Sequence, residues 1–165
     1  MRVALTGTPG TGKTTASDRL ESSVIHLNEA VREADLWSER DAERDSLVVD
    51  ETAVAEWLGD WDGVLESHLA HRFDADLVVV LRCRPDVLET RLLERGEPPA
   101  KARENAESEA LDVILSEAVE RYGTERVHEI DTTDRTPAEV ATEIRAAVDG
   151  ERDPDPGHLD FIEYL

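Results

Sequence analysis

The sequence predicts an α/β fold in which a five-stranded parallel sheet carries helices on both faces. Apolar runs alternate with segments of helical pattern along most of the 165 residues, an order typical of parallel sheets. The run 77–81 is apolar at every position, as expected of a strand that is covered on both sides. A glycine-rich segment follows the first apolar run, where a strand–loop–helix unit would place it.

Five short apolar runs are the expected strands, at 3–5, 24–27, 64–65, 77–81 and 127–130. The expected helices lie between and after them, at 14–21, 29–36, 51–58, 86–94, 102–122 and 137–148. In the last helix Val140, Ile144 and Val148 recur every four residues and therefore form one buried stripe.

Residues 7–14 contain the complete pattern G-x-x-x-x-G-K-[ST] of a nucleotide phosphate-binding loop. Gly10 and Gly12 allow the backbone to direct N–H groups inward around phosphate oxygens. Lys13 can reach the β- and γ-phosphates, and the Thr14 hydroxyl, with Thr15 behind it, can hold Mg²⁺. A glycine-rich turn that binds nothing is the alternative, but the strand before the loop and the helix after it favour the motif. We therefore predict a P-loop NTPase fold that binds a nucleoside triphosphate.

Length and charge limit the classes of protein that the chain can belong to. The chain is long enough for one domain, and 39 acidic against 18 basic residues give a net charge of −21. Such a surface is expected in a salt-loving cell, because salt screens the self-repulsion. The charge argues against nucleic-acid and anionic-membrane binding. With a lone Cys83 and no segment that approaches a membrane span, we expect a cytoplasmic protein.

Two arginines suggest a lid. Arg91 and Arg95 are four residues apart, which places them on one helical face, and a Gly/Pro-rich turn follows. This arrangement suits a short lid, at about residues 94–104, that closes over a triphosphate. The alternative is a solvated face on which Glu89 and Glu94 pair with the arginines.

Two carboxylates, Glu66 and Asp50, are candidates for the residue beside Mg²⁺. Glu66 ends the expected strand at 64–65, and His68 follows it. From that position Glu66 can orient the Mg²⁺ shell or a water, and His68 can donate to phosphates or position the nucleophile. Asp50 also follows an apolar run, but a helical segment comes next, so it is more simply explained as a helix N-cap. We favour Glu66, with Thr14, as the metal-side pair.

The combination of these residues resembles the small adenylate-kinase-like NTPases typified by adenylate kinase isoenzyme six, a family with archaeal and nuclear eukaryotic members. The resemblance covers about residues 2–148. It rests first on the phosphate loop at 6–15. The monophosphate-binding region of the family is matched by Ala30-Val31-Arg32-Glu33, by an acidic stretch with Asp41 and Asp45, and by Val48-Val49-Asp50-Glu51. The family's Asp-x-His motif is matched by Glu66-x-His68 with Phe73, and its short lid by Leu81-Arg82 through Arg91-Leu92 to Glu94-Arg95-Gly96, with Asn105 and Glu109. Glu66 stands where the family usually has Asp, and His26 where it often has Asn.

The resemblance implies a broad-specificity nucleoside monophosphate (adenylate) kinase with ATPase activity, with Mg²⁺ as cofactor and with ATP and AMP as substrates. It also implies a role in late small-ribosomal-subunit maturation, through a basic ribosomal protein of the platform. A monophosphate-binding region would lie at about residues 26–49. The residues that it implies are Lys13, Glu66, His68 and Arg95 for catalysis, Arg32, His26 and Asp50 at the acceptor, and Arg91 with Arg95 in the lid.

Three functions remain open at this point. The first is an adenylate kinase with ATPase side activity. The second is an assembly factor whose ATPase cycle drives binding and release of a basic protein, and the third is a P-loop kinase of another small metabolite. Residues 1–149 would form the kinase domain, followed by an acidic tail at 150–165. The apolar end of that tail either docks on a partner or packs back on the domain, and we favour packing.

Overall fold

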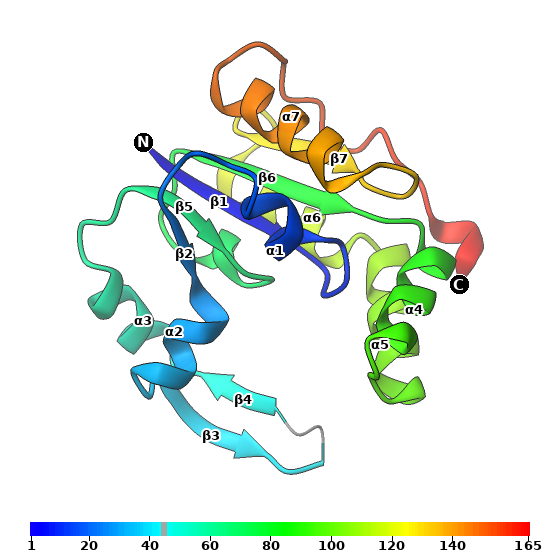
Figure 1. Ribbon diagram of the computed structural model, residues 1–165, viewed down its shortest axis with the longest axis horizontal. Helices are drawn as coiled ribbons and strands as arrows, with labels where there is room; N and C mark the ends of the chain where they lie inside the picture. The colour runs from blue at the N-terminus through cyan, green and yellow to red at the C-terminus, as the bar shows by residue number, and fades with distance from the viewer. Residues whose placement is uncertain (44–45) are drawn as a thin grey trace.

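Five parallel strands form the central sheet in the order β2-β5-β1-β6-β7 (Figure 1). The structure is a computed structural model that describes residues 1–43 and 46–165, so that Asp45 of the acidic stretch lies outside the described residues. The strands are β1 (Arg2–Gly7), β2 (Val24–His26), β5 (Gly63–Glu66), β6 (Leu77–Arg82) and β7 (Val127–Asp131). All neighbouring strands of this sheet pair in parallel, which confirms the predicted fold class.

Helices cover both faces of the sheet. Ala16, Val140 and Ile144 belong to α1 and α7 and pack on the side chains of one face. Val31, Val54, Leu115 and Ala118 belong to α2, α3 and α6 and pack on the other. The bounds are α1 (Lys13–Ser17), α2 (Leu27–Glu33), α3 (Glu51–Leu58), α6 (Val113–Tyr122) and α7 (Pro137–Val148). Two short 3-10 helices, η1 (Ala70–Arg72) and η2 (Ile162–Tyr164), complete this set.

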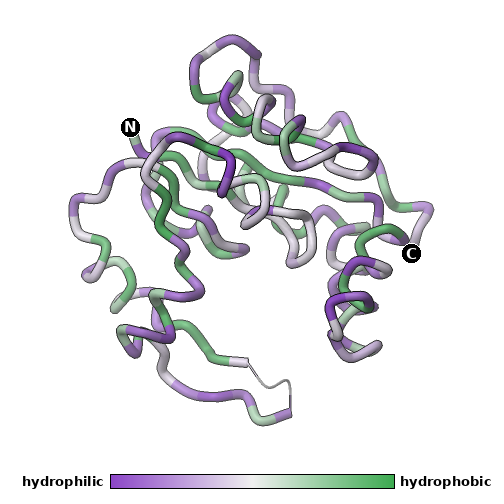
Figure 2. Tube along the Cα trace, in the orientation of Figure 1, coloured by the Kyte–Doolittle hydropathy of each residue, from purple (hydrophilic) through white to green (hydrophobic). Residues whose placement is uncertain are grey.

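Hydropathy follows these layers. In Figure 2 the central strands are mostly hydrophobic, whereas the loops and the outer turns of the helices are mostly hydrophilic. No helix in the described part of the chain is both long and apolar enough to cross a membrane.

The helix expected at 102–122 is two helices, which corrects the prediction. They are α5 (Pro99–Ala110) and α6, and the chain turns between them at Asp112, which has a left-handed φ of 55°. The Asp112 carboxylate binds the buried Arg82 guanidinium, an interaction that explains the break and that the local sequence pattern does not reveal. The helix expected at 14–21 is also shorter, since α1 ends at Ser17.

Two protrusions follow the carboxyl ends of central strands. After β2 and α2, β3 (Trp37–Asp41) and β4 (Ser46–Val49) form an antiparallel hairpin that we did not predict. Four of the five β3 residues are exposed, so β3 lacks the apolar alternation that marks a strand. After β6, α4 (Pro85–Glu94) and α5 pack together on the opposite side (Figure 1).

The C-terminal tail packs back on the domain, as favoured from its sequence. Phe161 is buried, and Glu129 of β7 accepts hydrogen bonds from the backbone N–H groups of Gly157 and His158, at 3.0 and 3.1 Å. The tail therefore covers the edge of the sheet beside α5 rather than extending into solvent.

Candidate nucleotide-binding site

The loop between β1 and α1 is fixed by its own hydrogen bonds and by α4. Thr11 donates to the Thr8 carbonyl from both its backbone N–H and its hydroxyl, at 3.2 and 2.8 Å. Gly10 has a φ of +94°, and a Cβ at this position would lie 2.8 Å from a methyl carbon of Leu88. A larger residue would be strained at this φ and would press on the Leu88 side chain of α4.

Lys13 is held inside this loop. Its Nζ donates to the carbonyls of Gly7 and Thr8, at 2.9 and 3.1 Å. Burial lowers the pKa of Lys13 to about 8, while the carboxylates of Glu66 and Glu109 act in the opposite direction. The side chain therefore remains mostly cationic at neutral pH, beside the backbone of the loop.

Glu66 lies next to the loop because its strand, β5, is the direct neighbour of β1. Leu5 pairs with Glu66 in the parallel register, so both strands end at the same edge of the sheet. The buried Glu66 carboxylate accepts a hydrogen bond from the Thr14 hydroxyl at 3.3 Å, and its other oxygen lies 3.0 Å from Nδ1 of His26. The first turn of α1 and the end of β5 thus bring a hydroxyl and a carboxylate together beside Lys13.

The Thr14–Glu66 pair fits a magnesium ion. Mg²⁺ prefers oxygen ligands and usually takes only one or two from the protein, the rest being waters and substrate phosphates. Thr14 and Glu66 supply two such oxygens at the phosphate loop. Residues 1–43 and 46–165 contain no group of three or more His, Cys, Asp or Glu side chains that would indicate an all-protein metal cage.

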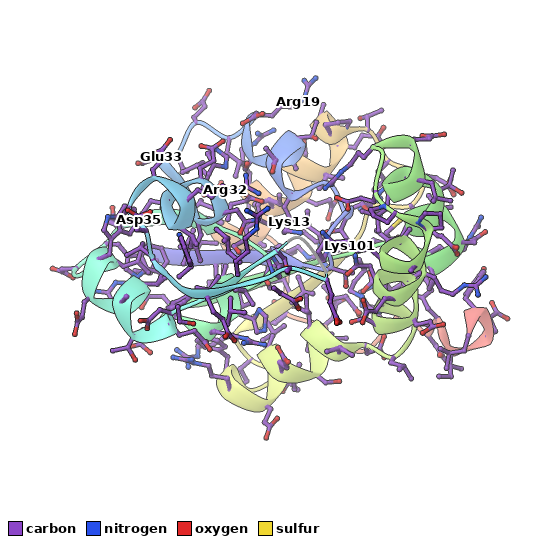
Figure 3. The ribbon with its side chains drawn as sticks, turned by 90° about the horizontal axis from the view of Figure 1, so that it is seen from below. Lys13, Arg19, Arg32, Glu33, Asp35 and Lys101 are labelled. Atoms are coloured by element: carbon purple, nitrogen blue, oxygen red, sulfur yellow. The ribbon has the colours of Figure 1, made fainter. Side chains whose placement is uncertain are left out.

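A cleft of about 1320 Å³ opens over the loop, between the β3–β4 side and the α4–α5 side. Its lining includes nine of the predicted site residues: Gly10, Gly12, Lys13, Thr14, Thr15, Arg32, Glu66, His68 and Arg95. In Figure 3, Lys13 is seen between Arg32 of α2 and Lys101 of α5. The site thus joins elements that are far apart in the sequence.

The charge of the cleft differs from that of the rest of the protein. Its described lining holds five basic and four acidic side chains, whereas the whole chain has a net charge of −21. The basic residues are Lys13, Arg32, Arg40, Arg95 and Lys101, and both lysines of the chain are among them. Clustered cations in a cleft attract anionic ligands, so the cleft suits phosphate groups.

His68 contributes a neutral imidazole to the same cleft. Burial, the largest cause, and the nearby cations Lys13, Arg72 and Lys101 together lower the pKa of His68 to about 4. The ring can therefore donate or accept one hydrogen bond at neutral pH but carries no charge there.

The two predicted lid arginines have different surroundings. Arg95 lines the cleft, has a side chain that is 57% exposed, and lies 3.6 Å from Glu97. Arg91 instead donates to the carbonyls of Thr132 and Thr133, at 3.0 and 3.3 Å, and is absent from the described lining.

Two predicted acceptor residues also lie outside the described lining of the cleft. The Asp50 side chain accepts from the Ala53 N–H at 3.1 Å and caps α3, in agreement with the simpler N-cap interpretation. His26 contacts the Glu66 carboxylate, with its Nδ1 3.0 Å from Oε2, and is absent from the described lining.

Sequence reasoning missed several residues of the cleft wall. Asn28, Arg40 and Ser108 line it without a sequence motif that distinguishes them. Lys101 had a usable signal, because the chain contains only two lysines and the other belongs to the loop. Leu47 and Val49 line the cleft from β4, the strand that the sequence pattern did not predict.

Sequence comparisons place the chain among known proteins. A family model described as an AAA domain matches residues 3–112. A protein of Natronomonas pharaonis named "Putative adenylate kinase" is 62% identical over 168 residues, with 100% of both chains covered. Proteins of the same name are 54% identical in Halobacterium salinarum, again with 100% of both chains covered, and 44% identical in Methanothermobacter thermautotrophicus, with 99% of this chain and 98% of the relative covered.

Solved structures of low sequence identity share the fold. Shikimate kinase from Aquifex aeolicus aligns with a TM-score of 0.54 and 19% identity, covering 92% of this chain and 98% of that one. Shikimate kinase from Bacteroides thetaiotaomicron gives 0.50 and 20%, covering 91% and 98%. These two structural similarities show a shared fold only, whereas the family model and the full-length relatives show family membership. The chain belongs to the AAA domain family and to the small archaeal adenylate-kinase-like family that its sequence resembles.

Proposed function

We propose that the protein is an ATP-dependent nucleoside monophosphate kinase that transfers the γ-phosphoryl group of ATP to AMP. The observation that carries the proposal is one cleft with two different walls. The phosphate loop and Arg95 lie at one part of it, and Arg32 lies with apolar side chains at another. A kinase needs both substrates in one cavity, with their reacting groups adjacent and water excluded.

The acceptor wall favours a nucleotide over a small polar acid. Val31, Leu47 and Val49 line the cleft from α2 and β4, on the same side as Arg32. Apolar side chains can contact the faces of a nucleobase, while the guanidinium can bind a phosphate in a bidentate manner. Base and phosphate together account for both kinds of side chain. We therefore infer that AMP or a similar monophosphate binds here.

In the proposed reaction, an oxygen of the acceptor phosphate attacks the γ-phosphorus of ATP. The bond from that phosphorus to the β–γ bridging oxygen breaks, and both products are nucleoside diphosphates. Lys13 and Arg95 stabilise the charge that develops on the transferred group and on the leaving oxygen. Thr14 and Glu66 would hold Mg²⁺, which neutralises charge on the β- and γ-phosphates when bound. Neutral His68 orients a phosphate oxygen or the attacking group through one hydrogen bond.

ATP hydrolysis is the same transfer with water as acceptor, and we propose it as a side activity of this site. We also propose a cytoplasmic role in late small-ribosomal-subunit maturation through a basic platform ribosomal protein. The net charge of −21 supports a basic partner, because complementary charge raises the association rate. If ATPase turnover drives such binding and release, kinase turnover is incidental. A P-loop kinase of another small metabolite is the remaining alternative.

The test measures ADP formation from MgATP with and without AMP, in about 2 M KCl to suit the acidic surface. A kinase forms ADP strongly only when AMP is present. ADP and phosphate formed at a rate indifferent to AMP would instead support an ATPase that serves a partner.

Arg32→Ala separates the two activities, because Arg32 is placed at the acceptor and not at the loop. We expect it to abolish AMP phosphorylation and to spare ATP hydrolysis. Arg19→Ala is the matched control, since Arg19 is exposed and points away from the cleft in Figure 3. Equal loss of both activities in Arg32→Ala would contradict its role at the acceptor.

A further inference from the structure

The C-terminal tail contacts a buried arginine. Phe161 is 7% exposed, and the Arg82 guanidinium carbon lies 5.2 Å from the centre of its ring. The same guanidinium binds Glu129, and Glu129 accepts from the Gly157 and His158 backbone N–H groups. The tail therefore touches Arg82 both directly, through an aromatic face, and indirectly, through a shared carboxylate.

Arg82 also holds Glu109, which belongs to α5. Arg82 Nε donates to Glu109 Oε1 at 3.2 Å, and Arg82 Nη2 donates to the Glu109 backbone carbonyl at 3.1 Å. Both side chains are almost completely buried, at 1% and 3% exposed. A buried carboxylate must keep its donors, because an unpaired charge in the interior is costly. Arg82 therefore helps to hold Glu109 in place.

Glu109 in turn reaches the phosphate loop. Its Oε1 accepts a hydrogen bond from the Thr8 hydroxyl at 3.1 Å, and its Oε2 accepts from the Cys83 N–H at 2.8 Å. Burial raises the pKa of Glu109, and the Arg82, Cys83 and Thr8 donors oppose that change. The Thr8 carbonyl, on the same residue, accepts from Lys13 Nζ. One line of contacts thus runs from Phe161 through Arg82, Glu109 and Thr8 to Lys13.

We propose that Phe161, Arg82 and Glu109 are positioning residues for the phosphate loop, so that the C-terminal tail tunes the affinity of the loop for MgATP. Arg82 would keep Glu109 under Thr8, and Phe161 would keep the guanidinium in the orientation that does so. The inference rests on the proposed function only in that the loop binds MgATP. It gives the tail a role at the ATP site that is separate from the acceptor.

The test is a double-mutant cycle read by the equilibrium dissociation constant of MgATP, measured by titration calorimetry on the full chain. Phe161→Ala should weaken MgATP binding roughly 3- to 10-fold, the range of a coupled residue outside the binding site. Thr8→Val removes the hydroxyl that Glu109 holds. In the Thr8→Val background the further effect of Phe161→Ala should fall below about 2-fold, because the connection is already broken.

Thr8→Ser is the conservative variant that keeps the hydroxyl, and the full effect of Phe161→Ala should return in its background. Ile162→Ala is the matched tail control, because Ile162 is 51% exposed, and its binding should equal that of the wild type. Phe161→Leu, which keeps an apolar side chain but loses the aromatic face, is measured in the same cycle and carries the test if Phe161→Ala does not fold.

The outcomes are distinct. Effects of Phe161 and Thr8 that simply add would overturn the proposal, as would unchanged binding in Phe161→Ala or in folded Phe161→Leu. A wild-type protein that fails to bind MgATP would refute the proposed function itself, which is a different result.

Discussion

Glu66 and His26 form a partly buried contact, with Glu66 Oε2 3.0 Å from His26 Nδ1, while Glu66 Oε1 accepts from the Thr14 hydroxyl. The two residues come from neighbouring strand ends, β5 and β2, in register with each other. A carboxylate held on both oxygens has one orientation. We therefore expect His26 to orient Glu66, the carboxylate proposed for the metal site.

Removing the His26 side chain should change the Mg²⁺ dependence of the reaction more than the KM for AMP. We expect His26→Ala to raise the Mg²⁺ concentration for half-maximal ADP formation roughly 10- to 100-fold, the range for residues that hold a metal ligand. His26→Asn keeps a donor group and should lie between Ala and wild type. Kinetics at several Mg²⁺ concentrations provide the measurement. A rise in the KM for AMP at unchanged Mg²⁺ dependence would place His26 at the acceptor after all.

Substitution of Arg91 should reduce mainly stability, whereas substitution of Arg95 should reduce mainly activity. Arg91→Ala removes charged hydrogen bonds to two carbonyls and should lower the free energy of unfolding by about 1.5–3 kcal/mol. Arg95→Ala removes a largely exposed side chain and should leave stability nearly unchanged, while kcat falls roughly 100-fold or more. Thermal melts and kcat are measured on both variants. The reverse assignment, a destabilised Arg95→Ala with normal kcat, would contradict the geometry.

The sequence was sufficient for the sheet and for the loop. The strands could be predicted from continuous apolar runs, because both faces of the sheet are covered and Val78, Val79 and Val80 are all buried. The loop was visible because its residues are adjacent in the chain. β3 was missed because four of its five residues are exposed, and an exposed hairpin lacks a hydrophobic period.

Contacts between distant segments were beyond sequence reasoning. The sequence pattern is helical both before and after Asp112, yet the structure has a break there. The side-chain partner of Asp112, Arg82, lies 30 residues earlier. Glu109 carries part of the family resemblance, yet nothing in its neighbourhood indicates a hydrogen bond to Thr8, 101 residues away. Side-chain partners of this kind depend on the packed fold and not on local pattern.

Lys13 should give MgATP binding an alkaline limit. The pKa of Lys13 is lowered to about 8 by burial, and the cationic form, which attracts phosphate, dominates below that pH. Binding should therefore weaken as pH rises through about 8, whereas the phosphates of ATP are already ionised there. Lys13→Arg keeps its charge throughout this range, so any binding that it retains should not show the limit. A wild-type dissociation constant that is constant up to pH 10 would contradict the prediction.

Salt should stabilise the fold, because repulsion among 39 acidic residues outweighs the surface ion pairs that salt weakens. Exposed pairs such as Arg84–Asp86 and Arg121–Asp74 contribute little to stability, because solvent screens them. The Debye length falls from about 10 Å at 0.1 M to about 3 Å at 1 M, so repulsion is screened mainly within this range. The melting temperature should therefore rise with KCl, most steeply below about 1 M. NaCl of equal ionic strength should act alike if screening is the cause, and a melting temperature that falls steadily up to molar KCl would show that the ion pairs dominate.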